Sequence, residues 1–178
     1  MQTEYAGFFA ALAGIAGALI GLLFVAISLA PDRIMGTSAT LNNRETAVGA
    51  FSVLSNVMFV ALSVLIPAEV LGWTTMAGAL GTGLAVVVYA GLSIARFRSR
   101  PPWVWALWLL RRLATVLLVT WEFLVALHIL THGISSGSLT QLSIICLLLT
   151  AVGLDRSWEL IGGQRHPLLE ARRLKPEV

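Results

Sequence analysis

One carboxylate and two imidazoles interrupt the otherwise apolar run LLVTWEFLVALHILTH, residues 117–132. Glu122 is ten residues from Arg112 and eleven from Gly133, so a helix at 1.5 Å per residue places it about 15 Å from either end. A carboxylate at the middle of a bilayer is unfavourable by roughly 3 kcal/mol on insertion scales, and such residues usually face a bundle interior or wet cavity and mark ion or proton pathways. We therefore predict an ion pathway at Glu122.

A second interpretation makes Glu122 a structural residue. Its carboxyl group, protonated or hydrogen-bonded, would tie its helix to Asn56, Ser52 or Ser55 on another span. In the first interpretation, Asn56 and Glu69 belong to the predicted ion pathway with Glu122. Glu69 follows Pro67 at the outer end of the second span, where it would concentrate cations at a pore mouth or form part of a solvated helix end.

The two histidines are the other candidates for chemistry. His128 and His132 are four residues apart and therefore share a helix face. They could take one metal ion, but adjacent turns of one helix supply only two of the three or four ligands that zinc requires. The same spacing does not place imidazoles on both sides of a haem plane. We predict no metal site and no cofactor.

Composition assigns the chain to the membrane. Of 178 residues, 57% are hydrophobic and 12% are charged, against roughly 25% charged residues in soluble domains. The single cysteine, Cys146, has no intrachain partner for a disulfide. No phosphate-binding loop, HExxH sequence or nucleophile with a base is present, so we predict no enzymatic activity. The net charge of +3 follows from topology and gives no support for nucleic acid binding.

Five segments have the length and apolarity to cross a bilayer, which takes about 20 residues. Together they predict an all-α, polytopic membrane helical bundle with a single transmembrane domain, residues 1–160, and a basic cytoplasmic tail, residues 161–178. The predicted spans are about Ala6–Ala30, Ala47–Val70, Thr74–Ala95, Leu113–His132 and Leu139–Leu154.

The distribution of positive charge predicts the orientation. With five spans, all 12 Lys and Arg residues fall on one side of the membrane, and such residues collect in cytoplasmic connections. The predicted topology is therefore N-terminus out and C-terminus in. Abundant Ala, Gly and Leu, with arginine strongly favoured over lysine, indicate the inner membrane of a bacterium.

The segment PPWVWALWLLRR, residues 101–112, precedes the fourth span. We predict a helix lying in the membrane interface, where tryptophan rings are favoured, because a span beginning at Trp103 would bury two arginines. The alternative is one long tilted helix with snorkelling arginines. Anionic lipid headgroups are the expected partners of five arginines on this side: Arg96, Arg98, Arg100, Arg111 and Arg112.

Small residues recur along the first span. Four of them follow one another at intervals of seven residues: Gly7, Gly14, Gly21 and Ser28. Gly17 and Gly21 also form a GxxxG pair. Small residues allow close backbone approach, which supplies much of helix association energy in lipid. Two interpretations stay open, namely packing within the chain and a seam between copies of a homo-oligomer.

The sequence GALIGLLFVAISLAPDRI, with an echo in SWELIG, resembles small bacterial membrane proteins, some of them labelled as modulators of a membrane AAA protease. The resemblance covers roughly residues 14–34 and implies a regulatory or accessory role without assigning functional residues. Two functions are therefore expected. One is an oligomeric ion- or proton-conducting protein that uses Glu122. The other is a non-conducting accessory subunit that binds another membrane protein through the small-residue face of the first span.

Overall fold

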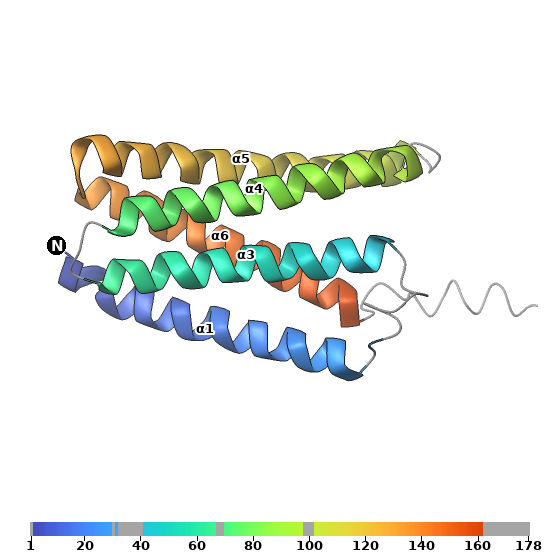
Figure 1. Ribbon diagram of the computed structural model, residues 1–178, viewed down its shortest axis with the longest axis horizontal. Helices are drawn as coiled ribbons and strands as arrows, with labels where there is room; N and C mark the ends of the chain where they lie inside the picture. Colours follow the sequence, from blue (N-terminus) through green and yellow to red (C-terminus); the bar gives the residue numbers. More distant parts are fainter. Residues whose placement is uncertain (1, 30, 32–40, 67–69, 98–101, 162–178) are drawn as a thin grey trace, which may run out of the picture.

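A computed structural model describes residues 2–29, 31, 41–66, 70–97 and 102–161, which form five helices (Figure 1). The helices are α1 (Gln2–Leu29), α3 (Leu41–Leu65), α4 (Val70–Phe97), α5 (Pro102–His132) and α6 (Ser136–Ile161). Each contains a stretch of at least 23 residues that is apolar enough to cross a membrane. The predicted count of five spans in an all-α protein is confirmed, and it indicates a multi-pass membrane protein.

The helices run alternately up and down a bundle in which α3 is central (Figure 1). Helix α3 packs against α1, α4 and α6, while α5 packs against α4 and α6. Helix α1 lies at the edge and packs on α3 and α6. Because the number of helices is odd, α1 begins at one end of the bundle and α6 finishes at the other (Figure 1). We call the end where α3 and α5 begin the basic end, after the arginines described below.

Backbone and hydroxyl groups are satisfied inside the helices, as a bilayer requires. Ser63 Oγ donates to the Phe59 carbonyl at 2.6 Å, and Thr75 Oγ1 donates to the Leu71 carbonyl at 2.7 Å. These bonds to the preceding turn make buried hydroxyls tolerable in an apolar core. Helix α5 ends at His132, and the next residue, Gly133, has a φ of 83°, the left-handed conformation that favours glycine.

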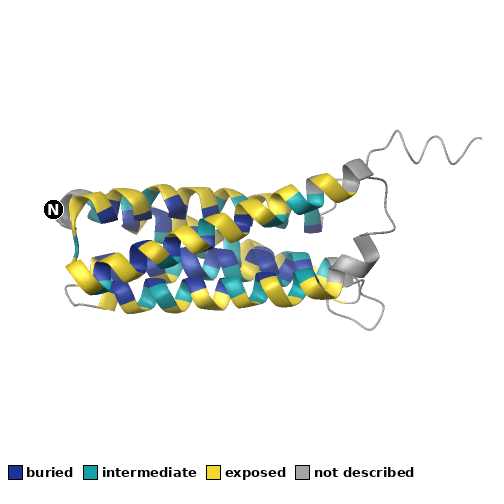
Figure 2. Cartoon of the chain, turned by 90° about the horizontal axis from the view of Figure 1, so that it is seen from above, coloured by how far each residue is buried: buried dark blue, intermediate teal, exposed yellow. Residues whose placement is uncertain are grey.

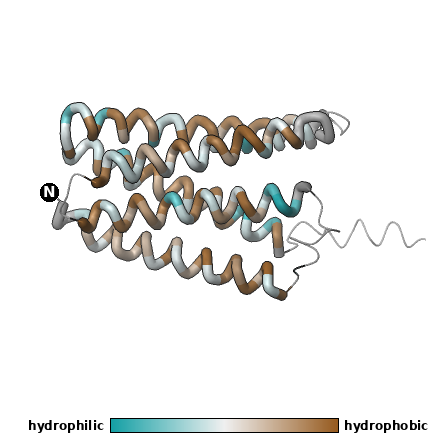
Figure 3. The backbone as a smooth tube through the Cα atoms, viewed as in Figure 1, coloured by the Kyte–Doolittle hydropathy of each residue, from teal (hydrophilic) through white to brown (hydrophobic). Residues whose placement is uncertain are grey.

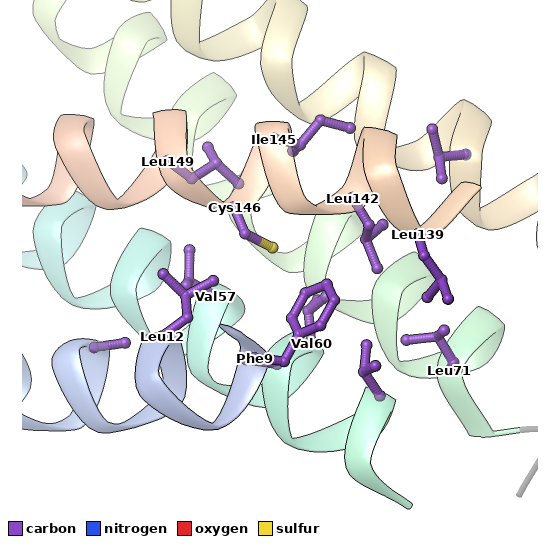
Figure 4. Packing of buried hydrophobic residues seen from close by; sticks show 14 of the residues in the cluster. Phe9, Leu12, Val57, Val60, Leu71, Leu139, Leu142, Ile145, Cys146 and Leu149 are labelled. Carbon is purple, nitrogen blue, oxygen red and sulfur yellow. The ribbon is translucent and has the colours of Figure 1, made fainter. Parts of the chain in front are cut away.

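Apolar residues are found both among the buried and among the exposed positions of the helices, as the colouring by burial and by hydropathy shows (Figures 2 and 3). Leu84 and Leu117, for example, are 66% and 69% exposed on the outside of the bundle. Because both surfaces of the helices are apolar, the bundle suits a hydrocarbon solvent. The largest buried cluster, shown in Figure 4, includes Phe9, Leu12, Val57, Val60, Leu71, Leu139, Leu142, Ile145, Cys146 and Leu149.

The small-residue seam of the first span faces away from the other described helices. Gly7, Gly14, Gly21 and Ser28 all lie on the outside of α1, and a Cβ atom built on any of the three glycines meets nothing within 4 Å. Gly17 is turned partly inward, with Met58 Sδ at 4.0 Å from such an atom. Packing of this seam inside the bundle is therefore not found.

Other glycines bring the helices together instead. Gly72 lies against the Leu130 side chain, and Gly153 lies against Leu54. A Cβ atom would approach Leu130 Cδ2 to 2.7 Å and Leu54 Cδ2 to 2.6 Å, closer than real contacts. Close contact between α4 and α5, and between α3 and α6, thus depends on residues outside the α1 stripe.

Helix α5 is continuous over 31 residues, or about 46 Å at 1.5 Å per residue. The chain does not turn between Pro102 and His132, so the segment that precedes the predicted fourth span belongs to the same helix as that span. Helix α6 also extends past the predicted boundary at Leu154 and ends at Ile161. Its acidic residues are neutralised there by Arg111, which removes the reason to end the helix early.

Candidate functional site

The carboxyl group of Glu122 is bound by Asn56 inside the bundle. Asn56 Nδ2 donates to Glu122 Oε1 at 2.9 Å and to Oε2 at 2.8 Å, joining α3 to α5. Glu122 is 1% exposed and Asn56 is 4% exposed. Of the three partners that the structural interpretation named, Asn56, Ser52 and Ser55, the structure places Asn56 on the Glu122 carboxyl group. An acid held in this way faces the protein interior, where the ion-pathway interpretation also requires it.

Asn56 uses only one side of its carboxamide. Its Oδ1 atom is buried and has no hydrogen-bond partner within the part of the chain that the structure describes. The atom lies against Gly78 of α4, where any Cβ would collide with it. A carboxylate needs donors, which Nδ2 provides, whereas a protonated carboxyl needs an acceptor for its O–H. A partial turn of the Asn56 side chain would offer Oδ1 as that acceptor, so the pair can accommodate Glu122 in either protonation state.

The surroundings of this pair differ between the two ends of the bundle. One turn farther from the basic end on α3, Val60 begins an apolar layer with Phe9, Leu71 and Leu139 (Figure 4). The buried hydroxyls on this far side, those of Ser63 and Thr75, donate to carbonyls of their own helices. Further polar side chains lie in the other direction. Ser52, which is half-buried, and the buried Thr82 and Thr115 are on the basic-end side of Asn56, Gly78 and Glu122, respectively.

A small cavity lies among these polar residues toward the basic end. Its volume is about 10 Å³, roughly that of one water molecule. It is walled by α3, α4, α5 and α6, and its polar lining consists of Glu45, Ser52, Thr82, Tyr89, Arg112 and Arg156. Polar groups therefore extend from the basic end to within one or two helical turns of Glu122.

An ion pair between Arg112 and Glu45 borders this cavity. The two side chains are 13% and 5% exposed, so both charges are held within the bundle. Arg112 also lies over the Trp108 ring, with its guanidinium carbon 5.6 Å from the ring centroid. Arg112 was expected to contact lipid headgroups or to snorkel. The structure instead engages it with a carboxylate of α3, which compensates the burial of its charge.

Arg111 and Arg156 belong, with this ion pair, to what we call the charged cluster. Its six members are Glu45, Arg111, Arg112, Asp155, Arg156 and Glu159. Arg111 forms ion pairs with Asp155, at 2.8 Å, and with Glu159, and its side chain is 50% exposed. Arg156 lies over Gly49 of α3, and its Nη2 donates to Thr115 Oγ1 at 3.4 Å. The cluster joins α3, α5 and α6 with three basic and three acidic side chains.

Sequence reasoning missed Glu45 and Arg156 as site residues, although a signal was available. Glu45, Ser52 and Asn56 recur at helical spacing on one face of α3. A polar face on an otherwise apolar helix predicts polar partners on the neighbouring helices. Several predicted residues lie outside the described part of the chain or have undescribed side chains: Glu69, Arg96, Arg98, Arg100 and the tail from residue 162.

Comparison with known proteins gives no further guide to this site. No family model matches the chain, and no curated protein or solved structure matches it. The role of Glu122 therefore has to be inferred from the chemistry of its surroundings.

Proposed function

We propose that this chain is a self-associating protein of the bacterial inner membrane in which Glu122 binds and passes protons. The observation that carries the proposal is the Asn56–Glu122 pair, which is buried ten residues before the end of α5 and includes an acceptor without a partner among the described residues, Asn56 Oδ1. An intramembrane acid without a basic partner at hand is expensive to keep, and function is the usual reason for it.

The size of the cavity favours a proton over a metal cation. A space of about 10 Å³ holds about one water molecule, whereas a hydrated cation needs several. A proton moves along hydroxyl groups and single waters and needs no open pore. Ser52 and Thr82 line the cavity and offer such groups between the charged cluster and Glu122. The apolar layer on the far side separates Glu122 from the opposite surface, so passage across it requires a change in packing.

The orientation belongs to the same proposal. We place the basic end in the cytoplasm, since arginines collect on the cytoplasmic side of inner-membrane proteins. The N-terminus would then be outside. Helix α5, at about 46 Å, is longer than the hydrocarbon core of about 30 Å. Its first turns would thus extend into the headgroup layer, with Trp105 and Trp108 at the interface and Arg96, Arg98 and Arg100 near anionic lipids.

Proton flux into liposomes tests the proposal. Purified chain would be reconstituted with a pH-sensitive dye inside, and a membrane potential set by potassium and valinomycin would drive protons. We expect flux in the wild type and its loss in Glu122→Gln. Glu159→Gln is the matched control, because it neutralises a carboxylate of the charged cluster without touching the pair. An inactive wild type, or flux that survives Glu122→Gln, would overturn the proposal.

A second candidate function is favoured by the outward face of α1. Its small residues meet no other part of the described chain, and small residues let two helices approach closely in lipid. In this alternative the protein is a non-conducting accessory subunit, and another membrane protein occupies that face.

Cysteine cross-linking separates self-association from the accessory role. Gly14→Cys would be oxidised in native membranes and compared with Leu117→Cys, which lies on the exposed face of α5. A homodimer linked through Gly14→Cys alone supports self-association. A link formed only to a different membrane protein supports the accessory function, and equal linking at both positions contradicts a role for the α1 seam.

A further inference from the structure

The end of α5 opposite the charged cluster carries two exposed imidazoles. His128 and His132 both lie on the outside of the bundle, with ring centroids 4.6 Å apart and planes at 20°. We propose that these two side chains form a chelating site for one divalent copper ion, completed by water. The proposal is independent of proton passage at Glu122.

Spacing and stacking support a shared ligand. Residues four apart on a helix lie on one face, one turn above the other, and histidines at this spacing jointly bind metal in helical zinc sites. The nearly parallel rings are already neighbours on this face. The helix therefore presents both imidazoles to the same region of the surface.

Thr131 fixes which nitrogen of His132 is available. Thr131 Oγ1 lies 2.9 Å from the Leu127 carbonyl oxygen and 3.2 Å from that of His128. The same oxygen lies 2.7 Å from His132 Nδ1. We assign the hydroxyl proton to these carbonyl groups, and in that arrangement Oγ1 accepts the Nδ1 proton of His132. The lone pair of His132 is then on Nε2, and a partner on the other ring nitrogen is the usual support of a metal-binding histidine.

The position at the helix end adds to the attraction for a cation. His132 is the last residue of α5, and the free carbonyl groups of a helix C-terminus carry a partial negative charge. Positive charge is favoured within this last turn. Among the described residues, the nearest ion pairs are those of the charged cluster, toward the other end of the same helix.

The number of ligands decides which metal fits. The described residues contain no group of three or more His, Cys, Asp or Glu side chains that could hold a metal. Zinc usually takes three or four protein ligands, so the argument against zinc stands. Divalent copper accepts a tetragonal arrangement of imidazole nitrogens and water oxygens and heads the affinity order of the divalent first-row metals. Two imidazoles with water therefore fit Cu²⁺ best.

Titration with Cu²⁺ tests the site on the full-length chain in detergent, purified without a polyhistidine tag. Every protein in the series would carry His166→Ala to remove the third histidine of the sequence. We expect one ion per chain and electron paramagnetic resonance hyperfine structure from two nitrogens. His128→Ala and His132→Ala should each weaken binding by more than about tenfold, since even supporting residues of metal sites contribute about 10–100-fold.

Thr131→Val separates a positioned chelate from two unconstrained histidines. It keeps both imidazoles but removes the acceptor for Nδ1–H, so we expect about tenfold weaker binding with the two-nitrogen spectrum retained. Circular dichroism would verify that each variant keeps its helices. A spectrum with one nitrogen, or single-histidine variants that bind as tightly as the parent, would overturn the chelate. Unchanged affinity in Thr131→Val would overturn the assigned tautomer.

Discussion

Replacing Gly78 with alanine should damage the Asn56–Glu122 pair without touching either residue. A Cβ atom at Gly78 would occupy the position of Asn56 Oδ1, so the carboxamide has to move away from α4. That movement breaks the two bonds, of 2.9 and 2.8 Å, from Asn56 Nδ2 to Glu122. Gly81→Ala is the matched control, because a Cβ atom there meets nothing within 4 Å.

The pair of variants isolates the hydrogen bonds. Both exchange glycine for alanine within α4, so the gain in helix propensity, roughly 0.5–1 kcal/mol, is common to both. Hydrogen bonds between membrane helices contribute about 0.6 kcal/mol on average and up to about 1.7 kcal/mol. Loss of both bonds predicts that Gly78→Ala lowers the free energy of unfolding by about 1–3 kcal/mol relative to Gly81→Ala.

Unfolding in mixed micelles of increasing sodium dodecyl sulfate content, followed by circular dichroism, measures this difference. The same two variants can be reconstituted, and proton flux should fall in Gly78→Ala and persist in Gly81→Ala. Equal stability and equal flux in the two proteins would refute the inferred dependence of the Glu122 site on space at Gly78.

Two more predictions use the same unfolding assay. Asn56→Leu should lower the free energy of unfolding by about 1–3 kcal/mol, because the buried carboxyl group of Glu122 loses its partner. Adding Glu122→Leu should restore the stability, since an apolar pair suits the core. A double variant as unstable as the single one would count against this explanation. Arg112→Ala should lower the free energy of unfolding by about 3–5 kcal/mol, since it leaves the buried charge of Glu45 without its arginine partner. Arg111→Ala removes a half-exposed ion pair and should lower the free energy of unfolding by less than about 1 kcal/mol. Similar losses in the two arginine variants would contradict the assigned difference in burial.

Hydropathy was sufficient to predict the number of helices, because each span is an apolar segment long enough to cross a bilayer. Asn56 was also one of three residues predicted as the partner of Glu122, since a buried acid needs a polar partner and few are available on the spans. Both predictions depend on rules that apply to single residues or segments. They do not require knowledge of how neighbouring helices are rotated.

The rotation of each helix about its own axis could not be predicted from the sequence. Small residues at Gly14 and Gly21 suit an internal contact or an external seam equally well, and only packing shows that they face outward. The ion pair of Arg112 with Glu45 was missed for the same reason, because a charged residue near a predicted interface has a ready partner in lipid headgroups. The extension of α6 to Ile161 was missed because it depends on the ion pairs with Arg111.

The most direct measurement of the central claim is the protonation of Glu122 itself. Difference infrared spectroscopy of the reconstituted protein, recorded between alkaline and acidic buffer, detects the carbonyl stretch of a carboxylic acid as it gains a proton. We predict a band that appears on acidification, disappears in Glu122→Gln and shifts in Asn56→Leu, while the helices stay intact. A spectrum that is the same in wild type and Glu122→Gln would show that Glu122 does not exchange protons in the folded bundle, and proton passage through it would be contradicted.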